Sequence, residues 1–335
     1  MVRSIKKYFK ILVSNTPSIT VLMSVYNGAK FLDEAIDSIL TQTFTDFEFI
    51  IIDDASSDDS LQVINSYKDA RIIVLQNTKN IGLTKSLNIG IAKAKGKYIA
   101  RMDADDISMP KRLEKQFDFM EEHPEFAFCG TRAKTINDVG DQVNFFKEPL
   151  DSNKILGTLL LKNCFFHSSI TIRRDALLTV SGYDEEFIYA QDYRLYLQLF
   201  ESQLYGTNIN ESLLVFKVSS SGVSQTNTES QDNFACKAIQ KTLKSSYGIN
   251  VGVSLLKNIR KSIIYSEKLG VKQQIQSAYF FRKLYRNYHN RFFNNKLACE
   301  TIRSLINQSL NNTVQQNTIN MLMKRFVYFK SDFNN

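Results

Sequence analysis

Hydrophobic and polar positions follow two alternating periods along the first 130 residues. Short apolar, β-rich runs predict strands, and they lie at residues 20–25, 47–52, 72–75, 98–102 and 126–129. Between these runs, apolar residues recur every three or four positions, which predicts helices; the predicted helices begin near Phe31, Ser57, Leu83 and Pro110. Strands that alternate with helices at this spacing predict a Rossmann-like, mainly parallel sheet flanked by helices, with ligands at the carboxyl ends of its strands.

The pattern is less regular beyond residue 130. It predicts a hairpin near residues 137–140, a strand at 168–172 and a helix at 192–200. After about residue 235 only helical patterns occur, which predicts an all-helical C-terminal extension. Its clearest stripe interleaves basic residues with apolar ones, namely Tyr279, Phe280, Leu284, Tyr285, Tyr288 and Phe292. Such a stripe is typical of a helical-bundle core with a solvated basic face, and a membrane-surface helix is the alternative.

A polar stretch at residues 219–232 predicts a boundary between two regions. We therefore divide the chain into a basic N-terminal segment (1–17), an α/β domain (18–230) and a basic helical region (231–335). Residues 236–335 hold 17 Lys and Arg against three Asp and Glu, a net charge of +14, so the first 235 residues carry −6. A basic region of this kind suits anionic lipid, nucleic acid or an acidic polymer, and charge alone does not choose among them.

The composition predicts a cytoplasmic protein. No apolar run approaches the roughly 18 residues that a membrane-spanning helix needs, and the basic N-terminus has too short an apolar stretch for a signal peptide. The four cysteines lie far apart in no metal-ligand spacing, which predicts neither a zinc site nor a disulfide framework.

Polar side chains follow three of the predicted strands. Tyr26-Asn27 and Asp53-Asp54 follow the first two, and Asp103-Ala104-Asp105-Asp106 follows the fourth. Carboxylates one residue apart can both face a divalent cation that bridges a diphosphate, because Mg²⁺ takes oxygen ligands and shares phosphate oxygens. The alternative is a solvated acidic turn or a helix N-cap.

Five segments in sequence carry a resemblance to a known family. They read TVLMSVYNG (20–28), FIIIDDASSDDS (49–60), NIGLTKSLNIGIAKAKGKYIARMDADD (80–106), HSSITIRR (167–174) and GYDEEFIYAQDYRLYLQL (182–199). Over residues 18–225 the chain resembles a family-2 glycosyltransferase of the GT-A fold, the group that builds bacterial surface polysaccharides.

The resemblance implies a donor site at the strand ends. Asp105 is implied to bind Mg²⁺ or Mn²⁺, while Asp103 holds the ribose of the donor or shares the metal. Asp54 is implied to accept a hydrogen bond from a uracil imide, and Asp53 has the alternative of capping the next helix. The remaining implied donor-binding residues, which wall the nucleoside, are Tyr26 and Asn27, and Asp106 is given a supporting or capping role.

The resemblance also implies an acceptor side. An inverting transfer needs one general base, and the family places it in an acidic pair at the start of a helix. This chain has Gln191-Asp192 there, so Asp192 is the predicted base, with Gln191 beside the acceptor. His167 is implied to contact the acceptor or to make a structural hydrogen bond. Lys217 stands where the family commonly has arginine.

The implied activity is the transfer of a single sugar from a nucleotide-sugar, with UDP as the favoured nucleotide, to a glycan or lipid-linked acceptor. The Gln-x-x-Arg-Trp motif of processive synthases is absent, and the chain has no Trp. A nucleotidyltransferase is the alternative enzyme, although the Gly-rich loop after its first strand is missing here. A basic adaptor over an inactive core is the non-enzymatic alternative. We expect peripheral association of the basic region with an anionic membrane and no binding of nucleic acid.

Overall fold

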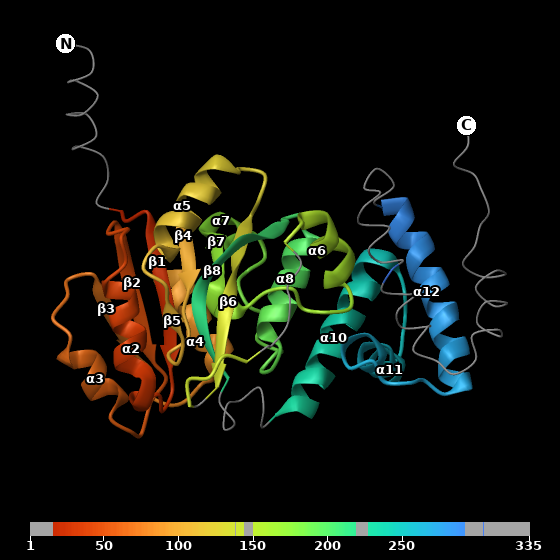
Figure 1. Ribbon diagram of the computed structural model, residues 1–335, viewed down its shortest axis with the longest axis horizontal. Helices are drawn as coiled ribbons and strands as arrows, with labels where there is room; N and C mark the ends of the chain where they lie inside the picture. The colour runs from red at the N-terminus through yellow and green to blue at the C-terminus, as the bar shows by residue number, and fades with distance from the viewer. Residues whose placement is uncertain (1–15, 138, 144–149, 219–226, 292–303, 305–335) are drawn as a thin grey trace, which may run out of the picture.

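One eight-stranded mixed sheet with helices on both faces forms the body of the molecule (Figure 1). The computed structural model describes residues 16–137, 139–143, 150–218, 227–291 and 304. The strands, in chain order, are β1 (Ile19–Val25), β2 (Phe47–Asp53), β3 (Ile72–Gln76), β4 (Tyr98–Arg101), β5 (Ile107–Ser108), β6 (Phe128–Asn137), β7 (Thr171–Arg173) and β8 (Gly206–Val218). In the sheet they lie in the order β3-β2-β1-β4-β7-β6-β8-β5.

The first half of the sheet is parallel, as the sequence predicts. β1 pairs in parallel with β2 and β4, and β2 pairs in parallel with β3. β1, β2 and β4 are almost entirely buried because helices cover both faces, which explains their continuous apolar sequences. β7 pairs antiparallel with β4 and β6, and β5 pairs antiparallel with β8, so the complete sheet is mixed.

Helices cover both faces of this sheet. Their bounds are α2 (Ala29–Leu40), α3 (Ser60–Ser66), α4 (Leu83–Lys93), α5 (Arg112–Glu122), α6 (Ser152–Leu159), η1 (His167–Ser169), α7 (Arg174–Thr179), α8 (Gln191–Glu201), α10 (Thr228–Tyr247), α11 (Val253–Ile264) and α12 (Val271–Arg291). Successive strand residues point to opposite faces. Phe49 and Ile51 of β2 therefore enter the core under α2 and α5, while Ile50 and Ile52 enter the core that includes α4 and α8.

The second half of the sheet differs from the sequence prediction. The predicted strand at 126–129 is the start of a ten-residue strand, β6. The predicted strand at 168–172 is a short 3₁₀ turn, η1, followed by β7. β8 was not predicted as a strand; it is held by its parallel pairing with β6, whose sequence lies far away along the chain. The turn near Gly140 is present, with Ile136 bridging Gln142.

The described C-terminal helices pack onto the α/β domain. Buried residues of α10, α11 and α12 belong to the same core as α8 and one face of the sheet. In α12 the buried residues include Phe280, Phe281 and Leu284, whereas Tyr279 is 70% exposed. The predicted stripe is therefore wrong for Tyr279. The face of α12 that packs on the core carries Phe280 and Leu284, four positions apart, and Tyr279 lies outside that face.

Several predictions fall on residues that the structure does not describe. These include residues 1–15, Phe292, Cys299 and the basic positions beyond residue 304. Cys129, Cys164 and Cys236 are buried free thiols. Within the described helices, none has the length and apolar character needed to span a bilayer.

Candidate active site

Three strand ends meet at one edge of the sheet. Because β2, β1 and β4 are parallel neighbours, the segments that follow them lie together. The backbone N–H of Asp54 donates to the carbonyl of Val25 at 2.8 Å. A Cβ placed on Gly28 would lie 3.6 Å from the Cβ of Ala104, so the turn after β1 contacts the acidic segment after β4.

The turn after β1 is tied to the loop after β2. Asn27 adopts a left-handed backbone (φ 53°), which asparagine tolerates better than most residues. Its Oδ1 accepts a hydrogen bond from the Ser57 backbone N–H at 2.8 Å, and its own N–H donates to Ser56 Oγ at 3.0 Å. The neighbouring Tyr26 is 53% exposed, so its ring is available to a ligand at this edge.

Asp54 holds a loop. Its buried carboxylate accepts hydrogen bonds from Asn77 Nδ2 (2.8 Å) and from the backbone N–H groups of Ile81 (3.0 Å) and Gly82 (2.8 Å). These bonds fix the segment that leads into α4. The carboxylate predicted to contact the nucleobase is therefore already bonded to three donors of the protein.

Asp53 is not a helix cap. The cap position of α3 is Asp59, and Asp53 Oδ1 instead accepts from the Ser56 N–H at 3.2 Å. The capping interpretation is therefore wrong. The other oxygen of Asp53, Oδ2, is buried and has no hydrogen-bond partner among the described residues. A buried acceptor without a partner is costly unless a ligand or water supplies a donor.

A single serine joins two of the acidic residues. Ser168 Oγ lies 2.5 Å from Asp103 Oδ2 and also contacts Asp106 Oδ2. One hydroxyl hydrogen cannot satisfy both carboxylates, so one of them must carry a proton. Burial, with the charges of Asp103 and Asp105, raises the pKa of Asp106 well above its usual value. Asp106 is therefore the protonated partner, and its Oδ1 accepts from the Lys217 backbone N–H at 2.9 Å.

Asp103 is ionised, and both of its carboxylate oxygens bind other side chains. Burial is the largest single effect and opposes its charge, but the Arg101 guanidinium and the Ser168 hydroxyl, with other neighbours, together outweigh it and keep the pKa of Asp103 below its usual value. Arg101, which is itself buried, forms an ion pair with Asp103 Oδ1. Both oxygens of Asp103 thus have partners, one in Arg101 and one in Ser168.

Asp105 differs from its two neighbours. Its half-buried carboxylate makes no hydrogen bond or ion pair with another side chain in the described part of the protein. Burial and the charge of Asp103 raise the pKa of Asp105 to about 6. The charges of Arg101 and Lys217 offset only part of this effect, so the site holds a carboxylate that no side chain of the described residues pairs with directly.

This donor set suits a metal shared with a substrate. Among the described residues, no three His, Cys, Asp or Glu side chains converge to form a metal site by themselves. Mg²⁺, however, is commonly bound by one or two carboxylates plus substrate phosphates, and it keeps several waters. Asp105, with Asp103 beside it, meets that requirement once a diphosphate is bound.

Asp192 lies in the first turn of α8, which starts after Ala190 in a left-handed conformation (φ 51°). Asp192 Oδ2 accepts a hydrogen bond from Asn163 Nδ2 at 2.9 Å, and Asn163 Oδ1 accepts from the Phe165 N–H at 3.1 Å. The asparagine therefore orients the carboxylate. Burial, reinforced by the charge of Asp103, raises the pKa of Asp192 despite these bonds.

His167 makes a hydrogen bond inside the protein. Its Nε2 lies 2.7 Å from the hydroxyl of Tyr183, and the two rings meet edge to face. Burial and the nearby Arg101 lower the pKa of His167 to about 3, so its imidazole is neutral near pH 7. Of the two predicted roles, these contacts favour the structural one.

Lys217 is placed beside the acidic segment. Its ammonium group pairs with Glu34 of α2 and lies 5.2 Å from the ring centroid of Phe31, while its backbone N–H binds Asp106. Lys217 thus connects β8 to the edge where the donor residues gather. Gln191 is half-buried next to Asp192 at the start of α8.

Comparison with known proteins identifies the family. The model of glycosyl transferase family 2 matches residues 20–180. The O-antigen biosynthesis glycosyltransferase WbnJ of Escherichia coli is 36% identical over 208 residues, which are 60% of this chain and 79% of WbnJ. The chain belongs to glycosyltransferase family 2.

Solved structures of other glycosyltransferases share its GT-A fold. Staphylococcus aureus TarS 1-349, in complex with UDP-GlcNAc, aligns with a TM-score of 0.59 over 89% of this chain and 93% of TarS, at 18% identity. The mannosyltransferase PcManGT of Pyrobaculum calidifontis, in complex with GDP-Man and Mn²⁺, aligns with a TM-score of 0.54 over 97% of this chain and 87% of PcManGT, at 13% identity.

The sequence did not single out several polar residues of this glycosyltransferase site. Arg101 and Ser168 bind Asp103, and Asn163 binds Asp192. Arg101 Nε and Nη1 and the hydroxyl of Tyr196 are buried without partners among the described residues. Arg101 has a detectable signal, since a charged residue at the end of an apolar strand and directly before an acidic cluster is expected to pair with it. Asn163 has none, because its contact depends on the packing of α8.

Proposed function

We propose that this family 2 enzyme transfers a single sugar, with inversion, from a nucleoside diphosphate sugar to a glycan or lipid-linked acceptor of a surface polysaccharide. UDP is the favoured nucleotide. The observation that carries the proposal is that two carboxylates in different environments both lie close enough to Asp103 to feel its charge: Asp105 makes no hydrogen bond or ion pair with another side chain of the described residues, and Asp192 is oriented by Asn163. The name of WbnJ, an O-antigen biosynthesis enzyme, supports the acceptor class.

Inversion follows from the number of carboxylates available for acid–base chemistry. Asp103 and Asp106 are occupied by Arg101, Ser168 and Lys217, so they are poor candidates for a nucleophile. Asp192 then acts as the general base that takes the proton of the acceptor hydroxyl as its oxygen attacks the anomeric carbon. A direct displacement by the acceptor inverts that carbon, whereas retention needs a second displacement.

Donor binding is assigned to the edge formed by β1, β2 and β4. A bound Mg²⁺ or Mn²⁺, held by Asp105 with Asp103 beside it, would neutralise charge on the departing nucleoside diphosphate. Tyr26 and Asn27 wall the nucleoside, and Asp54 holds the loop beside it.

The acceptor is assigned to the start of α8, beside Asp192 and Gln191. His167 supports this side through its bond to Tyr183, and Lys217 stands between the two substrates. A screen of donors tests the activity. Incubation with UDP-, dTDP- and GDP-sugars plus Mn²⁺, followed by measurement of the released nucleoside diphosphate, is expected to give release from UDP-sugars. Release from none of them would refute the proposal.

Asp54→Ala is expected to weaken donor binding by about tenfold or more, because three donors of the 77–82 segment lose a charged acceptor and each such bond is worth about 1.5–3 kcal/mol. Calorimetry with UDP measures the effect, with the turnover at saturating donor as a second readout. Asp59→Asn is the matched control, since Asp59 is an exposed carboxylate nearby that makes no side-chain cap bond. Equal UDP affinity in Asp54→Ala and the parent would refute this role.

Peripheral membrane association is proposed for the basic region. α10 to α12 pack on the α/β domain; Arg260 is buried in this packing, whereas Lys268, Lys272 and Lys283 of the same region are exposed. Each Lys or Arg near an anionic surface contributes about 1 kcal/mol. We expect co-sedimentation with vesicles that contain anionic lipid, reversed by high salt. Equal and negligible binding to neutral and anionic vesicles would exclude the association.

A further inference from the structure

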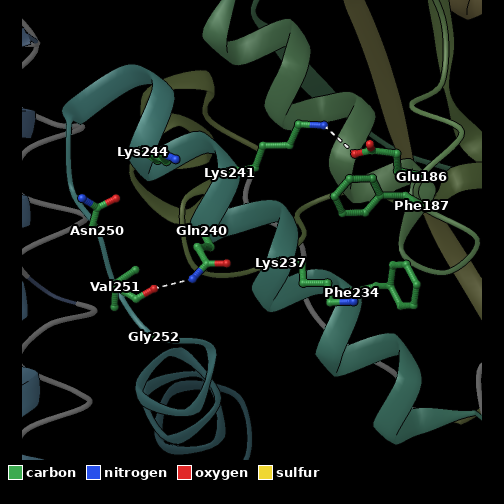
Figure 2. A pocket seen from close by; sticks show the side chains of 10 residues that line it. All are labelled: Glu186, Phe187, Phe234, Lys237, Gln240, Lys241, Lys244, Asn250, Val251 and Gly252. Carbon is green, nitrogen blue, oxygen red and sulfur yellow. Dashed lines mark hydrogen bonds and ion pairs between the residues drawn. The ribbon is translucent and has the colours of Figure 1, made fainter.

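A cavity lies away from the strand ends that form the candidate active site. A cavity of about 740 Å³ opens between α10, the connection from α10 to α11, and the segment before α8. Figure 2 shows its lining side chains, with three lysines carried by α10 and Phe187 on the facing segment. Small-molecule sites in proteins commonly measure 300–1,000 Å³, so this volume is large enough for a ligand of one or two sugar rings.

The lining is positively charged. Lys237, Lys241 and Lys244 lie at helical spacings of four and three residues, which places them on one face of α10. Glu186 is the one carboxylate of the lining, and it pairs with Lys241 at 3.1 Å. Lys241 also pairs with Asp184 at 2.7 Å, whereas Lys237 and Lys244 make no ion pair within the described residues and give the cavity its positive charge.

The same cavity has aromatic walls. The rings of Phe187 and Phe234 meet edge to face with centroids 5.9 Å apart, and the Lys237 ammonium lies 4.7 Å from the Phe234 centroid. Val251 closes the opposite side, where its carbonyl accepts from Gln240 Nε2 at 2.6 Å (Figure 2). Apolar faces with a few convergent charged groups suit a ligand that combines a ring surface with an anionic substituent.

The cavity adjoins the active site through the segment that leads into α8. The carbonyl of Phe187 accepts from Thr84 Oγ1 at 2.8 Å, and Thr84 lies in the first turn of α4, directly after the loop that Asp54 holds. Asp192 lies five positions after Phe187, so their Cα atoms are at most about 18 Å apart. A short oligosaccharide can cover that span.

We propose that this cavity is an acceptor subsite for an acidic glycan, which places a sugar ring against Phe234, beside the buried Phe187, and a phosphate group between Lys237 and Lys244. The inference rests on the proposed function, because it assigns the acceptor of that reaction to a phosphate-bearing class. Lys237 and Lys244 offer charges that no carboxylate of the described residues pairs with, while Lys241 stays paired with Asp184 and Glu186.

Calorimetry with maltose 1-phosphate as the probe, and neutral maltose beside it, tests the subsite. We expect the parent enzyme to bind the phosphorylated sugar and not the neutral one. The double exchange Lys237→Glu and Lys244→Glu is expected to weaken binding by tenfold or more, since each lost charged contact is worth about 1.5–3 kcal/mol. Lys244→Glu alone, which disturbs no ion pair, is expected to weaken it less. Lys283→Glu, an exposed lysine of α12, is the matched control and is expected to bind like the parent.

The outcomes separate this subsite from the proposed function. UDP affinity and the release of nucleoside diphosphate from UDP-sugar by the parent enzyme report the donor site, and the lysine variants are expected to keep the UDP affinity of the parent. Failure of those donor readouts in the parent enzyme refutes the proposed function, whereas normal readouts without maltose 1-phosphate binding refute the subsite alone.

Phosphatidylcholine vesicles with an equal share of phosphatidic acid form a third arm. If only these vesicles bind, and the double exchange removes their binding, the cavity takes a lipid headgroup and the glycan subsite is overturned.

Discussion

Asp192→Asn is expected to lower the rate of sugar transfer by roughly 10²–10⁴-fold while leaving UDP affinity unchanged. The amide keeps the shape of the side chain and its contact with Asn163, but it cannot accept the proton of the acceptor hydroxyl. The raised pKa of Asp192, caused first by burial, makes the carboxylate a stronger base than an ordinary aspartate. Turnover at saturating donor and calorimetry with UDP measure the two quantities.

Asn163→Ala provides a graded comparison for this variant. Asn163 donates to the charged form of Asp192 and so lowers its pKa; removing the bond is expected to raise the pKa further. Because transfer requires the deprotonated base, the fall in rate on the acid side should then begin at higher pH than in the parent. A variant Asp192→Asn with full transfer activity would show that the base lies elsewhere.

Asp105→Ala is expected to abolish nearly all transfer without unfolding the protein. Asp105 makes no hydrogen bond or ion pair with another side chain within the described residues, so its removal takes away only a local backbone hydrogen bond. The folded state holds the pKa of Asp105 at about 6, above its usual value, so its charge destabilises the metal-free protein at neutral pH. The melting temperature of metal-free Asp105→Ala at pH 7 should therefore equal or exceed that of the parent.

Metal dependence accompanies this prediction. EDTA is expected to inactivate the parent enzyme, and Mn²⁺ or Mg²⁺ to restore it. Asp118→Asn, which changes an exposed carboxylate of α5, serves as the control and should retain activity and metal response. If transfer survives both EDTA and the Asp105→Ala change, Asp105 does not bind a metal.

Sequence reasoning succeeded where the physical cause is local. The continuous apolar runs at 20–25 and 47–52 could only be strands buried on both faces, and the structure places them in the centre of the parallel half. It failed for β8, whose exposed Glu211 interrupts the apolar pattern and whose position depends on pairing with β6. It also placed Tyr279 in the buried stripe of α12. Neighbouring residues of a helix point in different directions, so Phe280 reaches the core and Tyr279 does not.

Charges show a similar division. The order of carboxylates after β1, β2 and β4 is readable from the chain, because parallel strands bring their ends to one edge. The protonation states of these carboxylates cannot be read from the chain, because a pKa depends on burial and on neighbours from other elements. Ser168 reaches Asp103 and Asp106 from a segment more than 60 residues away, and that contact makes one of them the protonated partner.

The sequence by itself determined the family, the parallel core of the sheet and the set of strand-end carboxylates, since each depends on the period of apolar residues and on motifs within one short segment. Only the tertiary structure decided which of those carboxylates is uncommitted. It engages Asp54 with the loop before α4 and leaves Asp105 without a side-chain partner in the described part of the chain. It also decided that α10 joins the core of the α/β domain and carries three lysines to a cavity near α8. The reason is that burial and hydrogen bonding are satisfied between residues far apart in sequence, and no local pattern records which partner each polar group finds.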